Sequence, residues 1–243
     1  MKSIRRRLSA AFIALVICMA EISLCMAAYA DKGSDTDSYG GAYAVTGQLA
    51  GAGYTTEVYD ASNGLPTSDA MFMLSASDGR MWLGGYSGVL RYDGSTFEKL
   101  DTAKGMTSAR CFFEDSKGRI WVGTNDNGVV VSDGLKRTHI TYKDGLPSSS
   151  IRNFAEDKAG NVFIGTTTGI CYADKDLVLH TPSGIDLSEE RVLRQDIDKT
   201  GRIYGQCSGG KIFAIENCEV TEVYESSEIG TEKITTIMAD PLN

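Results

Sequence analysis

The chain has 243 residues, of which 24 are basic and 32 are acidic, so its formal net charge at pH 7 is −8. Without residues 1–30, which hold four basic residues and one acidic residue, 20 basic and 31 acidic residues remain. This balance disfavours nucleic acid and an anionic membrane surface as partners, because both require clustered positive charge.

The N-terminus has the features of an export signal. Basic residues at positions 2–7 precede an apolar stretch at 10–20, and Ala28-Tyr29-Ala30 offers small residues before a cleavage point. Residues 1–30 are therefore predicted to be a secretory signal peptide. An uncleaved signal anchor is the competing reading, although the apolar stretch is shorter than the roughly 20 residues of a membrane span and Glu21 follows it.

Residues 31–53 are rich in Ser, Gly, Asp, Ala and Thr and contain little to bury, which predicts a flexible linker. Residues 54–243 form the repeat region. Its last segment, 234–240, resembles the first strand of a repeat, and the chain ends at Asn243 where a glycine and an aromatic residue should follow. We therefore expect a fragment of a longer protein, with four repeats, the start of a fifth and an incomplete ring.

A motif with a period of about 41 residues dominates this region. Its core is a glycine, two positions later an apolar residue, then an aromatic residue, and in three copies an aliphatic residue and a second glycine. The four copies start at Gly79, Gly118, Gly160 and Gly201, with spacings of 39, 42 and 41 residues. A fixed period in this range indicates a repeat architecture.

Each repeat is predicted to form four short strands. In the third copy these are residues 150–156, 161–166, 170–173 and 177–181, separated by turns rich in Gly, Asp and Pro. Four strands in about 40 residues are typical of one blade of a β-propeller, so the fold class is all-β. Each blade needs a large flat side chain at the same place in its core, and four residues are expected there: Trp82, Trp121, Phe163 and Tyr204.

These repeats resemble the two-component regulator propeller family. The similarity rests on Asp144-Gly145-Leu146-Pro147 followed by residues 156–166, and on Asp115-Ser116-Lys117-Gly118-Arg119-Ile120-Trp121-Val122-Gly123-Thr124. The first copy shares Asn63-Gly64-Leu65-Pro66, whereas the fourth has Tyr204-Gly205-Gln206 where the family has Trp-Ile-Gly. The resemblance covers about residues 54–243.

The sequence offers no catalytic, cofactor-binding or metal-binding residues, so no cofactor is expected. His139 and His180 stand alone and are interpreted as surface strand residues. Four aspartates near the first hairpin of each repeat are expected to cap the turns: Asp78, Asp115, Asp157 and Asp198. The Asp-x-x-Gly-x-x-Trp pattern also resembles the hairpin of sialidase-like propellers, whose central arginine cluster cannot be assigned from this sequence.

Four cysteines remain beyond the signal region: Cys111, Cys171, Cys207 and Cys218. Four cysteines allow three pairings, and their spacing matches no metal site. Buried free thiols are favoured, and a bridge between Cys207 and Cys218 on successive strands is the alternative.

The resemblance implies the extracytoplasmic sensor region of a membrane-bound bacterial signalling protein, followed by a histidine kinase or a diguanylate cyclase in the missing part. It also implies a small-molecule or glycan ligand, self-association in a dimeric receptor, and a periplasmic or extracellular location with a membrane tether. A secreted propeller enzyme, a glycan hydrolase or lyase, is the alternative. Loops between strands are the expected contact points, with Gly85-Tyr86-Ser87 and Asn125-Asp126-Asn127 as candidates.

Overall fold

A computed structural model describes residues 58–60, 62, 64–67, 69–100, 103, 105–134, 136–231 and 234–239. All of them belong to one compact unit, Gln48–Asn243. The predicted signal peptide, 1–30, and the predicted linker, 31–53, lie outside the described residues. Among the described residues, helical segments are too short or too polar to cross a membrane.

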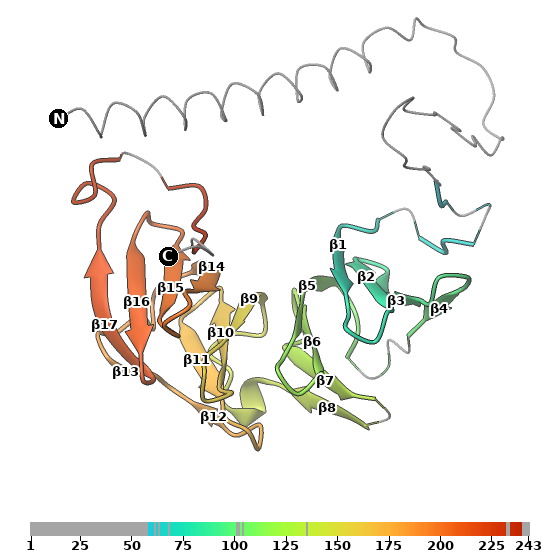
Figure 1. The fold of residues 1–243 in the computed structure, drawn as a ribbon, viewed down its shortest axis with the longest axis horizontal. Coiled ribbons are helices and arrows are strands. Elements are labelled where there is room, and N and C mark those ends of the chain that lie inside the picture. Colours follow the sequence, from blue (N-terminus) through green and yellow to red (C-terminus); the bar gives the residue numbers. More distant parts are fainter. Residues whose placement is uncertain are drawn as a thin grey trace, which may run out of the picture. The chain divides into compact units, whose positions relative to one another are not determined.

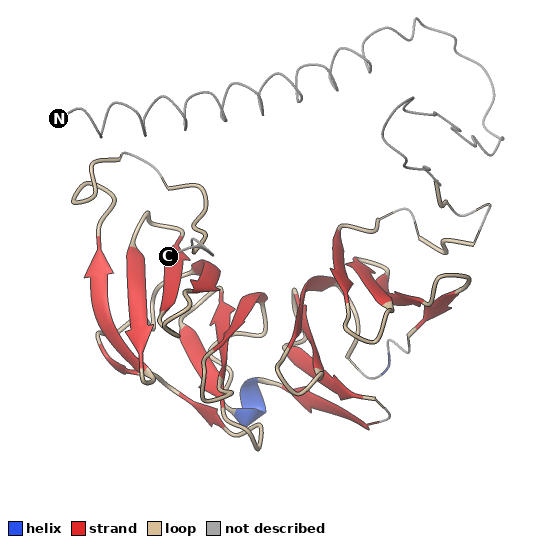
Figure 2. Ribbon diagram, in the orientation of Figure 1, coloured by secondary structure: helices blue, strands red, loops and turns tan. Residues whose placement is uncertain are grey.

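The described residues form four consecutive sheets, in which all strand pairs but one are antiparallel (Figures 1 and 2). The first contains β1 (Phe72–Ser75), β2 (Met81–Gly85), β3 (Gly88–Tyr92) and β4 (Phe97–Lys99). The second contains β5 (Ala109–Glu114), β6 (Ile120–Thr124), β7 (Val129–Asp133) and β8 (Lys136–Ile140). A 3₁₀ turn, η2 (Tyr142–Asp144), leads to the third, which contains β9 (Ile151–Glu156), β10 (Val162–Thr166), β11 (Ile170–Ala173) and β12 (Leu179–His180).

The fourth sheet contains five strands. Four of them form the blade: β14 (Val192–Ile197), β15 (Ile203–Cys207), β16 (Ile212–Glu216) and β17 (Glu219–Tyr224). The fifth, β13 (Ser183–Gly184), pairs parallel with β17 at the outer edge, an addition that the repeat pattern does not predict. The all-β class and the four-stranded propeller blades expected from the sequence are confirmed.

The aromatic residue of each motif is the second residue of the second strand of its sheet. Trp82, Trp121 and Phe163 are buried, as expected. Tyr204 occupies the equivalent position but is only partly buried, so the prediction of a buried ring is wrong for Tyr204. The other three rings pack against the next sheet along the chain, whereas Tyr204 borders residues 237–239, which form no strand.

Three hydrophobic clusters join successive sheets. One contains Trp82 and Val122, from the first and second sheets. The next contains Trp121 and Phe154, from the second and third. A last cluster contains Phe163 and residues of the fourth sheet. Because each cluster draws on two sheets, one blade alone does not complete a core.

The innermost strands follow one another: β1 contacts β5, β5 contacts β9, and β9 contacts β14. Residues 234–239, predicted as the first strand of a fifth repeat, form no strand. They nevertheless lie against the fourth sheet, because Ala239 N donates to Asp196 Oδ2 at 2.7 Å and Gln206 Nε2 donates to the Ile234 carbonyl oxygen at 2.6 Å.

Candidate ligand pocket on the innermost strands

A pocket of about 410 Å³ lies on the four innermost strands. Two residues of β1 and three consecutive residues of each of β5, β9 and β14 line it. Three of the lining side chains are arginines: Arg110 on β5, Arg152 on β9 and Arg194 on β14. No carboxylate of the described residues lines the pocket, although the chain as a whole is acidic.

Bulges in the innermost strands position these arginines. On β5, Ala109 pairs with Thr124 and Cys111 with Gly123, so the register skips Arg110. On β9 the register skips Arg152 in the same way, between Ile151 and Asn153. A bulge places an extra residue in one strand and re-aims side chains, which is why bulges occur beside binding sites.

The fourth blade shifts this pattern by one residue. On β14 the register skips Leu193, and Arg194 follows it as a paired residue opposite Gln206. Leu193 therefore takes the position that Arg110 and Arg152 occupy, and Arg194 enters the pocket from the next position.

The three guanidinium groups are unpaired within the described part of the chain. None of Arg110, Arg152 and Arg194 forms an ion pair there. Arg152 is partly buried, and its Nε and Nη1 atoms are buried without a hydrogen-bond partner. Burial lowers the pKa of Arg152 below the usual value for arginine, and the positive charges of Arg110 and Arg191 lower it further. The site therefore concentrates positive charge that an anion would stabilise.

A pair of amides lies beside the arginines. Gln195 Nε2 on β14 donates to Asn153 Oδ1 on β9, so the pair joins the third and fourth blades. The remaining polar atoms, Asn153 Nδ2 and Gln195 Oε1, are buried without a partner. The pair therefore offers one donor and one acceptor to a ligand.

Five residues form the apolar part of the lining: Phe72, Met73, Phe112, Phe154 and Leu193. The rings of Phe112 and Phe154 also pack against the core tryptophans Trp82 and Trp121. Guanidinium groups, amides and apolar side chains together suit a small ligand that has both a charged group and a carbon skeleton.

The loops expected to contact a ligand lie next to this pocket but outside it. Gly85, Tyr86 and Asn125 surround a separate hollow of about 20 Å³, which Arg110 also lines. The three arginines were not predicted as site residues from the sequence. A signal was present, because Arg110 and Arg152 are separated by the same 42 residues as Gly118 and Gly160.

The hairpin aspartates cap turns, as expected. Asp115 accepts hydrogen bonds from the backbone N–H groups of Lys117 and Arg119, at 3.0 and 2.9 Å. Asp157 and Asp198 make the same kind of contacts in the third and fourth blades. Asp78 also caps its turn but lies two positions later in the motif, where it accepts from Arg80 N.

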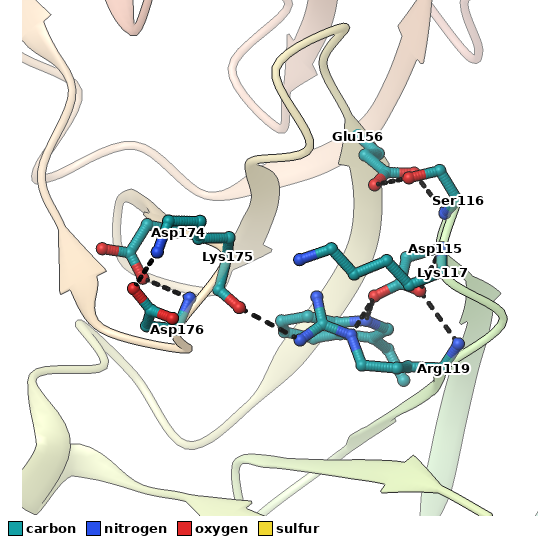
Figure 3. A network of polar contacts seen from close by, with 9 residues as sticks. Asp115, Ser116, Lys117, Arg119, Glu156, Asp174, Lys175 and Asp176 are labelled. Carbon is teal, nitrogen blue, oxygen red and sulfur yellow. Dashed lines mark hydrogen bonds and ion pairs between the residues drawn. The ribbon is translucent and has the colours of Figure 1, made fainter.

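Asp115 has the most enclosed environment of these aspartates (Figure 3). Its Oδ2 accepts from Arg119 Nε at 2.6 Å and from Trp121 Nε1 at 2.8 Å. Burial alone would raise the pKa of Asp115, but the hydrogen bonds from Trp121 and Arg119 together outweigh it, and the pKa lies below its ordinary value. Arg119 also donates to the Lys175 carbonyl oxygen in the third blade, at 3.5 Å. This group stabilises a hairpin and is not a catalytic arrangement.

The remaining candidate residues do not gather at the pocket. His139 lies on β8 and His180 on β12, both exposed. The four described cysteines are free, as the favoured reading expects, and burial raises the pKa of Cys171 to about 12. Within the described ranges, no group of three or more His, Cys, Asp or Glu side chains could hold a metal ion.

Two segments of the repeat region match a known protein family. Residues 105–126 and 145–168 match the two component regulator propeller family. These segments are two-component regulator propeller repeats. Each begins at the glycine of the turn before an innermost strand and includes Arg110 or Arg152. No curated protein sequence matches the chain.

Solved structures share the fold. The extracellular domain of BT3049, assigned as a hybrid two-component system of B. thetaiotaomicron, is 26% identical with a TM-score of 0.53, over 62% of this chain and 22% of that one. The corresponding domain of BT4673 from the same organism is 21% identical with a TM-score of 0.56, over 71% and 27% of the two chains. This chain thus spans about a quarter of these domains. A streptogramin B lyase is 15% identical with a TM-score of 0.55, over 67% and 57%, a likeness of fold alone.

Proposed function

We propose that this chain is part of the exported, ligand-sensing propeller of a membrane-bound bacterial signal-transduction protein. The match of two segments with the two-component regulator propeller family carries the proposal. The likeness to the extracellular domain of BT3049 supports it, and so does the export signal expected at residues 1–30.

The pocket suggests how such a propeller senses. Its lining comes from four separate blades, so a bound ligand contacts several blades at once. A ligand shifts an equilibrium between two packings only if it binds one of them better. In this mechanism the ligand favours one packing of the innermost strands, and a dimeric receptor relays the change through a membrane span to a histidine kinase or diguanylate cyclase.

The test uses the full-length protein encoded by the complete gene, reconstituted in lipid vesicles. Autophosphorylation or cyclic dinucleotide synthesis is measured while a panel of small metabolites and glycans is added. A compound that binds the propeller and changes the output by several-fold supports the proposal. A full-length product with no output domain, or with an output indifferent to every compound that binds, contradicts it.

The same panel of compounds tests the alternative that the protein is a secreted enzyme. The likeness to the lyase shows only the fold, and the described pocket lining holds arginines, amides and phenyl rings in place of an acid–base pair. Turnover of a glycan by the purified protein, lost when a pocket residue is changed, would replace the sensor proposal with a secreted enzyme.

A further inference from the structure

Four buried polar atoms of residues that line the pocket lack a hydrogen-bond partner in the described part of the chain. They are Arg152 Nε and Nη1, Asn153 Nδ2 and Gln195 Oε1. Unpaired buried polar groups are rare in folded proteins, because each one loses its hydration without compensation. These four come from three residues on two neighbouring strands, and all three residues line one pocket.

The three donors and the acceptor define complementary chemistry. Nε and Nη1 donate on different sides of the planar guanidinium, so each pairs with Nη2, side-on or end-on, when the group holds the two oxygens of a carboxylate. Asn153 Nδ2 and Gln195 Oε1 match a hydroxyl group, which accepts one hydrogen bond and donates another. The apolar lining residues Phe72, Met73 and Leu193 can contact the carbon atoms of such a ligand.

We propose that this pocket binds a small organic carboxylate that also carries a hydroxyl group. Arg152 anchors the carboxylate, while Arg110 and Arg194, on the strands either side of β9, add positive charge. The amide pair of Asn153 and Gln195 holds the hydroxyl group. The inference rests on the proposed function only in placing the ligand in this pocket, and binding can be measured without any signalling output.

A hydroxycarboxylate fits better than inorganic phosphate. A pocket of about 410 Å³ is within the range of small-molecule sites. Inorganic phosphate would satisfy the guanidinium group but would leave the apolar lining residues without a contact. The acidic balance of the chain makes a cluster of three unpaired arginines an exception to the surrounding charge.

Binding is tested by calorimetry on the full-length protein in detergent with four hydroxycarboxylates: malate, tartrate, citrate and gluconate. Matched probes omit one group each, namely succinate without the hydroxyl group, sorbitol without the carboxylate, and inorganic phosphate without carbon. We expect at least one hydroxycarboxylate to bind tenfold or more tightly than all three matched probes. Binding should weaken as salt concentration rises, because the attraction is screened.

Three variants locate the site. Arg152→Gln should reduce affinity at least tenfold, while Arg152→Lys, which keeps the charge but loses the planar fork, should recover only part of it. Arg194→Gln should weaken binding by a smaller factor, and because Arg194 is exposed, this variant separates ligand loss from misfolding. Arg137→Gln on β8 is the control, since Arg137 lies outside the pocket lining, and it should bind as the unchanged protein does.

A separate variant tests whether the amide pair of Asn153 and Gln195 binds the hydroxyl group. Gln195→Met should abolish the preference for malate over succinate while leaving succinate binding within about twofold. Phosphate that binds as tightly as every hydroxycarboxylate, or binding unaffected by both Arg152 variants, would overturn the inference. Hydroxycarboxylate binding without an effect on output would refute the sensor proposal alone, and output driven by other compounds without such binding would refute this inference alone.

Discussion

At the residue scale, the motif aspartate of the second blade links a turn to the core. The Asp115 carboxylate joins its own turn, the Arg119 guanidinium and the buried indole of Trp121. Arg119 then reaches the third blade through the Lys175 carbonyl oxygen (Figure 3). A single carboxylate therefore connects the hairpin, the aromatic core and the neighbouring sheet.

Asp115→Asn should lower the free energy of unfolding by about 3 kcal/mol, because it leaves the charge of Arg119 buried without its partner. Urea unfolding of the full-length protein measures this. Asp78→Asn, which changes an exposed contact with Arg80, is the matched control and should cost less than about 1 kcal/mol.

The destabilisation caused by Asp115→Asn should depend on pH in a defined direction. The folded-state pKa of Asp115 is depressed, so its contribution is present above the unfolded-state pKa of about 3.9. It is lost as pH falls through the folded-state pKa. The stability difference between wild type and Asp115→Asn should therefore persist at neutral pH and shrink in acid; a difference that grew on acidification would contradict this account.

The first blade lacks this arrangement. Trp82 Nε1 is buried without a partner, and Ala76 occupies the place that Asp115 has in the second blade. The backbone geometry is already correct, because Ala76 N donates to the Arg80 carbonyl oxygen just as Asp115 N donates to that of Arg119.

Ala76→Asp should therefore raise the free energy of unfolding by about 1 kcal/mol, through a charged hydrogen bond to Trp82. Thermal melting of the full-length protein gives the readout. The gain should disappear when Trp82→Phe is added, because the indole donor is then absent. A gain of the same size with and without Trp82 would show that the stabilisation has another source.

At the scale of strands, glycines let successive blades approach closely. A Cβ atom at Gly165 would lie 2.6 Å from Asn153 Oδ1, 2.8 Å from Val192 Cγ1 and 2.9 Å from Gln195 Nε2. The absence of a side chain on β10 thus allows β9 and β14 to pack together, and their contact holds the amide pair of the pocket.

Gly165→Ala should lower the free energy of unfolding by about 1 to 3 kcal/mol, because overpacking forces these neighbours apart. It should also weaken binding of any ligand held by the amide pair, measured by calorimetry on the same sample. Gly209→Ala is the control, since a Cβ atom there meets nothing within 4 Å. Equal effects of the two substitutions would remove the close approach as the explanation.

In the fourth blade an aromatic side chain fills the space that an aliphatic side chain fills in the other copies. Gly205 stands where the other copies have an aliphatic residue, and a Cβ atom there would lie 1.9 Å from Phe213 Cζ. The Phe213 ring thus occupies the volume that the aliphatic side chain fills elsewhere. Tyr204 points to the opposite face of β15, and the Arg202 guanidinium lies over its ring at 5.4 Å.

At the scale of the whole molecule, blades are joined by contacts that recur with the repeat. Ser77 donates to Glu114 of the second blade, and Ser116 donates to Glu156 of the third at 2.7 Å from both its backbone and its side chain. Together with cores that each span two sheets, these contacts tie the stability of one blade to that of the next.

Export is a prediction about the whole chain. We expect cleavage after Ala30, because residues 1–30 combine a basic start, an apolar stretch and small residues before Asp31. N-terminal sequencing of protein recovered from its native host should give Asp31 first. Recovery of membrane-bound protein that still begins at Met1 would instead favour the signal anchor.

The sequence alone determined the blades. Turn glycines and short apolar runs are local features, and in the third copy they specify the four strands to within two residues of the observed bounds. The hairpin aspartates were also predictable, because a cap depends on residues only two to four positions away. The partial exposure of Tyr204 was not, since it depends on the segment that lies against that face of the fourth sheet, residues 237–239.

The pocket could be recognised only from the tertiary structure. Arg110, Arg152 and Arg194 lie on strands about 40 residues apart, and they meet because successive innermost strands contact one another. Their direction depends on bulges, and a bulge depends on the register between two strands, which packing selects. The spacing of the arginines was visible in the sequence, but their lack of carboxylate partners within the described residues became apparent only when the blades were packed together.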